Sequence, residues 1–149
     1  MIRARADATV PVPPATVFAS VVDLDHADWL PAVRRLRRLG PETGVGARYA
    51  VEVGVLGRHL SGVLVCQELE APRRAVYVLE DGLDLVVTLD ITPVSGGSRL
   101  VIEARYSLAS KFGGPLERAS AGAARREVAR AVEQLAARFA RPDPARQGA

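Results

Sequence analysis

Residues Leu116–Phe139 read LERASAGAARREVARAVEQLAARF, and the predicted architecture follows from this segment. It contains no proline, and its one glycine is Gly122. Its apolar side chains recur at helical spacings and comprise Leu116, Ala124, Val128, Ala131, Val132, Leu135 and Phe139. This pattern predicts one amphipathic helix of about 24 residues, roughly 36 Å long at 1.5 Å per residue. Because only one side of the helix is apolar, another layer must cover that side.

The rest of the chain is rich in the alternating or apolar stretches that are typical of β-strands. We expect seven strands, at Ile2–Val10, Val33–Leu39, Ala47–Val55, Arg58–Leu69, Arg74–Glu80, Leu83–Thr92 and Arg99–Leu108. Two short helices, Ala15–Asp23 and Leu24–Leu30, follow the first strand. Consecutive strands with helices set apart predict an α+β fold, in which a curved antiparallel sheet wraps around the long helix.

The strand Arg99–Leu108 shows the alternation most clearly. Its pattern places Tyr106 on the buried face, whereas Glu103 and Arg105 face water. A shift by one residue would reverse these directions and expose Ile102, so we favour the first register. For the strand Arg58–Leu69, the sequence leaves open which face points inward.

The order and spacing of several short motifs carry a family resemblance. These motifs are Val10–Phe18 (VPVPPATVF), Asp23 with Asp28–Pro31 (DWLP), Gly44–Tyr49 (GVGARY), Glu68–Tyr77 (ELEAPRRAVY), and Leu89–Val94 (LDITPV) with Gly96–Arg99 (GGSR). Together they cover roughly Arg3 to Phe139, and the chain resembles the SRPBCC or START-type helix-grip proteins, within them the polyketide cyclase/dehydrase-like family. The resemblance implies a helix-grip fold with a cavity for a hydrophobic small molecule, sometimes with catalysis. The family shares no universal catalytic set, so no catalytic residue is carried over.

A sheet that bends around one helix leaves a concave, mostly apolar gap, which is a natural ligand pocket. The candidate pocket residues are Trp29, Tyr49, Tyr77, Val87, Leu89, Ile102, Tyr106, Val128 and Leu135. The buried hydroxyl of Tyr106 needs a partner, either a ligand or a backbone carbonyl. Trp29 lies either at the pocket mouth or between the short helices and the sheet.

The sequence contains no catalytic motif that we can assign. It has no phosphate-binding glycine loop and no G-x-S-x-G elbow. His26 and His59 lie far apart, and we expect neither to bind a metal. Cys66, the single cysteine, lies in an apolar run and is expected to be a buried structural thiol. We predict no cofactor, and whether the protein is an enzyme stays open; an enzyme would be of the polyketide cyclase or dehydratase type.

Four arginines surround Leu36, at Arg34, Arg35, Arg37 and Arg38. We interpret them as an exposed strand edge, with an interaction module for an acidic partner as the alternative. No stacking aromatics accompany them, and the net charge is only +3, so we do not expect nucleic acid binding.

The 149 residues fit one domain, predicted at 1–140, with a flexible tail at 141–149. No apolar run approaches the roughly 20 residues of a membrane-spanning helix, and the start of the chain lacks the apolar core of a signal peptide. We therefore expect a cytoplasmic monomer or homodimer without integral membrane association. The leading hypothesis is binding, transport or sequestration of a hydrophobic small molecule such as a lipid or polyketide.

Overall fold

The computed structural model describes residues 2–26, 29–30, 32–55, 58–80, 84–107 and 113–140. Its elements in chain order are β1 (Ile2–Val10), α1 (Pro14–Val21), the 3-10 helix η1 (Leu24–His26), β2 (Val33–Leu39), β3 (Arg48–Val55), β4 (Arg58–Glu70), β5 (Arg74–Glu80), β6 (Asp84–Val94), β7 (Gly97–Ser107) and α2 (Gly113–Ala140). The strands form one seven-stranded sheet in the order β1-β7-β6-β5-β4-β3-β2. Every neighbouring pair is antiparallel, which confirms the predicted fold class. The predicted tail at 141–149 lies outside the described residues.

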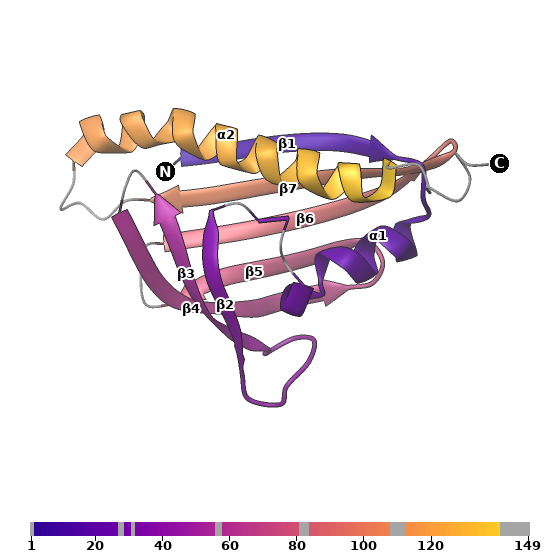
Figure 1. Ribbon diagram of the computed structural model, residues 1–149, viewed down its shortest axis with the longest axis horizontal. Coiled ribbons are helices and arrows are strands. Elements are labelled where there is room, and N and C mark those ends of the chain that lie inside the picture. Colours follow the sequence, from indigo (N-terminus) through magenta and orange to yellow (C-terminus); the bar gives the residue numbers. More distant parts are fainter. Residues whose placement is uncertain are drawn as a thin grey trace, which may run out of the picture.

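The long helix predicted from the apolar stripe is continuous, and it lies along β1 and β7 on the concave side of the sheet (Figure 1). Its stripe is buried at Val128, Ala131, Val132 and Leu135. Among the described residues, no helix is long and apolar enough to cross a membrane.

Two β-bulges bend the far half of the sheet. One interrupts the pairing of β2 with β3 between Val33 and Arg35, and the other interrupts that of β4 with β5 between Cys66 and Glu68. A bulge adds an unpaired residue and increases the local twist. In Figure 1, β2 and β3 accordingly pass in front of the flatter part of the sheet. The concave side is thus enclosed by α2 at one edge and by β2 and β3 at the other.

The segment between β1 and α1 packs closely against the start of β7. Ser98 is fully buried at the start of β7, and its hydroxyl donates a 2.7 Å hydrogen bond to the carbonyl of Val12. A Cβ at Gly97 would collide with the backbone of Val10 and Pro11, so only glycine allows the two chain segments to approach this closely.

The second predicted helix, Leu24–Leu30, is only partly correct. The described residues form one 3-10 turn at Leu24–His26, and Trp29 lies in a turn before β2. Pro31 disfavours helical geometry at Leu30, which explains why the periodic pattern there does not continue as a helix. Leu24 and Trp29 are nevertheless buried against the core.

The predicted facing of β7 is confirmed. Ile102 and Tyr106 are buried on the concave side, whereas Glu103 lies beside Arg3 and Arg105 on the outer side, 3.6 Å from the Nε of each. For β4, where the sequence left the direction open, Leu64 faces the concave side and Cys66 is buried opposite Tyr77.

Candidate functional site

A cavity of about 280 Å³ lies between α2 and the concave side of the sheet. Its walls come from α1, η1, the turn before β2, strands β2 to β7, and one side of α2. Apart from Trp29, Tyr77, Tyr106 and Glu127, the lining residues that the structure describes are aliphatic or glycine. The volume lies just below the roughly 300–1,000 Å³ of typical small-molecule pockets, and the apolar lining is of the kind such pockets have.

Most of the residues chosen from the sequence meet at this cavity. Those that line it are Trp29, Tyr77, Val87, Leu89, Ile102, Tyr106 and Val128. They come from the turn before β2, from three strands and from α2, so the fold brings together positions that are about 100 residues apart. Two candidates do not line the cavity, and their placement corrects the prediction.

Tyr49 and Leu135 belong to the packed core instead. Tyr49 is 5% exposed, and its ring lies beneath the guanidinium of Arg38, whose Cζ is 5.9 Å from the ring centroid. Leu135 is completely buried one turn beyond Ala131, the last residue of α2 that reaches the cavity. The apolar stripe of a helix identifies which side is buried, but it does not distinguish the part that packs from the part that borders a void.

Tyr106 has a protein partner for its hydroxyl. Its phenol oxygen lies 2.7 Å from the Oγ of Ser120 on α2, and both residues are buried. This bond ties β7 to the long helix across the cavity wall. The partner is a side chain, whereas the sequence had suggested a backbone carbonyl or a ligand.

Tyr77 contributes a neutral hydroxyl to the cavity. Burial is the main cause that raises its pKa, and the neighbouring Cys66 and Tyr49 add to the effect. The phenol is therefore protonated at neutral pH. Among the described residues, no hydrogen bond of this hydroxyl is found.

Glu127 is the functional candidate that the sequence analysis missed. Among the described lining residues it is the charged one, and its Oε1 lies 3.4 Å from Nη1 of Arg130. Its Oε2 is buried without a hydrogen-bond partner, as is the indole Nε1 of Trp29. A signal was present: Glu127 lies three residues after Ala124 and four before Ala131, which is the spacing of the apolar stripe.

The sequence also matches a known family. The profile of the family described as polyketide cyclase/dehydrase and lipid transport matches residues 1–140. The chain belongs to this family. No curated protein matches the sequence.

Solved structures share the fold of this polyketide cyclase-like protein. TTHA0849 from Thermus thermophilus is 22% identical with a TM-score of 0.80, over 92% of this chain and 96% of that one. The Zhui aromatase/cyclase from a Streptomyces species is 18% identical with a TM-score of 0.75, over 92% of each chain. A START superfamily protein from Mycobacterium smegmatis is 15% identical with a TM-score of 0.70, over 91% of this chain and 97% of that one.

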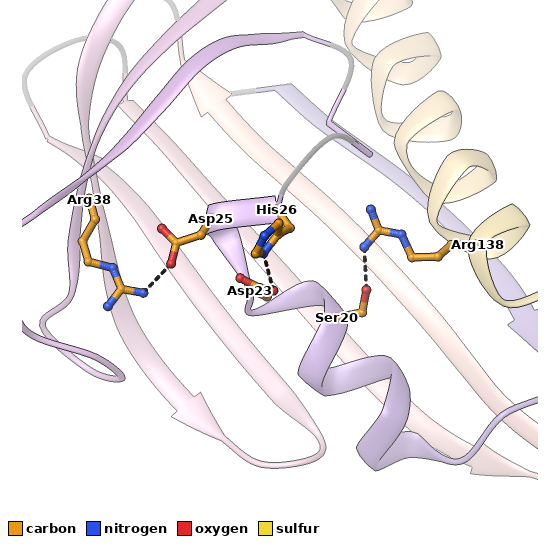
Figure 2. Close-up of polar contacts among 6 residues, drawn as sticks. All are labelled: Ser20, Asp23, Asp25, His26, Arg38 and Arg138. Carbon is orange, nitrogen blue, oxygen red and sulfur yellow. Dashed lines mark hydrogen bonds and ion pairs between the residues drawn. The ribbon is translucent and has the colours of Figure 1, made fainter.

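Within this family member, the helical segment α1–η1 that borders the cavity is held from both sides (Figure 2). Arg38 of β2 donates a 2.9 Å hydrogen bond to Asp25 of η1, and Arg138 of α2 donates a 2.8 Å hydrogen bond to Ser20 of α1. These contacts join the two walls of the cavity through the segment between them. Arg38 is thus half-buried against Asp25 and the ring of Tyr49, which corrects its assignment to a fully exposed arginine edge.

The other three arginines of the cluster are exposed, as expected. Arg35 and Arg37, with Glu52 and Ser61, line an open groove of about 460 Å³ on the outer face of β2 to β4. This groove is open to solvent and is formed by the outer side chains of a sheet edge. The buried polar atoms that lack partners in the described residues lie outside its lining. We therefore take the inner cavity as the candidate site.

The histidines and the cysteine lie outside the cavity lining. His26 is exposed 2.9 Å from Asp23, and His59 is exposed 3.2 Å from Glu52. The Cys66 thiol is buried, and burial raises its pKa, so it is a protonated structural thiol as predicted. Within the described part of the chain, no group of three potential ligands is placed to hold a metal.

Proposed function

We propose that the protein binds a hydrophobic small molecule in the cavity between α2 and the sheet, for transport or sequestration. The observation that carries the proposal is the lining: a concave space walled by aliphatic side chains, with Trp29, Tyr77, Tyr106 and Glu127 as its polar members. Removing apolar ligand surface from water is favourable by roughly 25 cal/mol per Å², so such a space selects apolar guests.

The size of the cavity limits the guest. At about 280 Å³, the cavity lies just below the roughly 300–1,000 Å³ of typical small-molecule pockets. A compact guest such as two fused aromatic rings is therefore a suitable probe. The segment α1–η1, which Arg38 and Arg138 hold by hydrogen bonds, borders this space.

Blocking the cavity tests the proposal. Ala124 lines the cavity from α2, whereas Ala137 is exposed on the same helix and lies outside the lining. We expect Ala124→Phe to weaken the binding of a naphthalene probe at least tenfold in isothermal titration calorimetry, because the new ring occupies the space. Ala137→Phe is the matched control and should bind like the wild type. Equal affinity of all three proteins for the probe would refute a ligand site at this cavity.

A second candidate function is a cyclase or dehydratase acting in the same cavity. The observation that favours it is the presence of Glu127 in the lining, because such reactions need a general base near the substrate. The solved aromatase/cyclase with the same fold supports this alternative only through its architecture.

The enzyme alternative has a separate test. The protein would be incubated with an uncyclised poly-β-ketone thioester, and cyclic product would be followed by mass spectrometry. Glu127→Gln should abolish product formation while a naphthalene probe still binds. Turnover that is unchanged in Glu127→Gln, or no product with the wild type, would remove this alternative and leave the binding function standing.

A further inference from the structure

Two walls of the cavity each contain one buried polar atom without a partner. On the turn before β2, Trp29 is 3% exposed, and its indole Nε1 forms no hydrogen bond. On α2, Oε2 of Glu127 is likewise buried without a partner. Both residues line the cavity, so each borders the space that a bound molecule would occupy.

The chemistry of the two atoms is complementary. An indole N–H can only donate a hydrogen bond, whereas a carboxylate oxygen can only accept one. Buried polar groups without partners are rare in folded proteins, and each one calls for an explanation. A bound molecule that carries both an acceptor and a donor can supply the partner that each atom lacks.

The other polar groups near the cavity indicate which atoms remain to bind a guest. Arg130 contacts Oε1 of Glu127 at 3.4 Å and is exposed, so the other oxygen, Oε2, is the one left for a guest. The hydroxyl of Tyr106 is already bonded to Ser120. The neutral hydroxyl of Tyr77 can donate to or accept from a second polar group. Glu127 is the only charged residue among the cavity-lining residues that are described.

We propose that the ligand of this cavity is a neutral, hydroxylated hydrophobic molecule, a phenol or an alcohol, rather than a carboxylic acid or a plain hydrocarbon. The ligand's hydroxyl oxygen accepts a hydrogen bond from Trp29 Nε1, and the same hydroxyl donates a hydrogen bond to Glu127 Oε2. A carboxylate ligand would bring a second negative charge beside Glu127 and has no proton to donate to it. This inference rests on the proposed binding function, because it names the class of ligand for the same cavity.

Three probes of one shape test the inference on the unmodified protein. They are 2-naphthol, 2-methylnaphthalene and 2-naphthoate, measured at pH 7 by isothermal titration calorimetry. We expect 2-naphthol to bind at least tenfold more tightly than 2-methylnaphthalene, and 2-naphthoate to bind most weakly. Equal affinities of the first two, or tightest binding of 2-naphthoate, would overturn the hydroxyl assignment while leaving cavity binding intact. No binding of any of the three would overturn both.

Variants of Glu127 and Trp29 test whether these two residues cause the preference for 2-naphthol over 2-methylnaphthalene. Glu127→Leu and Trp29→Phe should each reduce the advantage of 2-naphthol over 2-methylnaphthalene to less than threefold. Glu133→Leu, an exposed position of α2 outside the lining, is the control and should keep the full advantage. If either cavity variant keeps a tenfold advantage, its residue is not a partner of the hydroxyl. The probe series on the wild type stays decisive even if a variant folds poorly.

Discussion

The phenol oxygen of Tyr106 and the hydroxyl oxygen of Ser120 lie 2.7 Å apart in a buried contact that joins β7 to α2. Tyr106 also lines the cavity, so the same side chain both closes the wall and fastens it to the helix. We infer that the hydrogen bond of this phenol stabilises the packing of α2 against β7.

The first prediction concerns that bond. Tyr106→Phe should lower the free energy of unfolding by about 1–2 kcal/mol, because a buried hydrogen bond is lost and the ring stays in place. Urea denaturation measures the change. Tyr77→Phe is the matched control: its hydroxyl has no partner among the described residues, so its removal should change stability by less than about 0.5 kcal/mol. A double-mutant cycle with Ser120→Ala should show a coupling of about 0.5 kcal/mol or more, and strict additivity would contradict the bond.

The second prediction separates the packed core from the cavity wall. Leu135 is fully buried, so Leu135→Ala should cost about 2–5 kcal/mol by leaving a new void. Leu85 is partly exposed and already borders empty space, so Leu85→Ala should cost clearly less. Thermal and urea unfolding measure both. If Leu85→Ala were the more damaging change, our boundary between core and cavity would be misplaced.

The third prediction concerns the segment that borders the cavity. The Arg38–Asp25 pair is partly exposed, with side chains 34% and 49% accessible, so Asp25→Asn should cost at most about 1 kcal/mol of stability. Its effect should instead appear locally, as faster amide hydrogen exchange in η1 and faster release of a bound probe. Asp7→Asn, which breaks the exposed pair with Arg99 on the far edge, is the control. Unchanged exchange in η1 would show that Arg38 does not hold this segment.

The fourth prediction is a dependence of stability on pH. Burial raises the pKa of Tyr77 in the folded protein above its unfolded value of about 10. The folded state therefore holds this proton more firmly, so the contribution is fully present below pH 10 and is lost as the pH rises toward the folded pKa. Stability should fall above about pH 10, and Tyr77→Phe should flatten that fall. An identical alkaline profile for the variant would show that Tyr77 ionises like an exposed tyrosine.

Much of the architecture was predictable because local patterns determine it. The strands Val33–Leu39 and Arg74–Glu80 were placed with the observed bounds, since turn residues delimit both. The long helix followed from its apolar stripe, and the inward direction of Tyr106 followed from strict alternation. These features depend on neighbours within a few residues.

The cavity depends on the curvature of the β-sheet. The spacing of apolar residues along strands and helices does not specify that curvature. The bulges at Val33/Arg35 and Cys66/Glu68 alter how the sheet bends, and they thereby affect which stretch of α2 borders the cavity. Tyr49 and Leu135 were consequently expected in the cavity and lie in the core, whereas Glu127 was overlooked. Arg38 was assigned to an exposed edge because its partner Asp25 lies thirteen residues away in the sequence. A local pattern does not reveal a contact over that separation.

A methyl NMR titration of the wild-type protein with 2-naphthol shows directly whether the cavity holds a ligand. We predict saturable shifts for the methyl groups of Leu64, Val87 and Val128, which line the cavity from two strands and from α2. Val45 and Val94, which are exposed large hydrophobic residues at 62% and 37%, should stay unchanged. Shifts confined to Val45 and Val94, with silent cavity methyl groups, would contradict an internal ligand site.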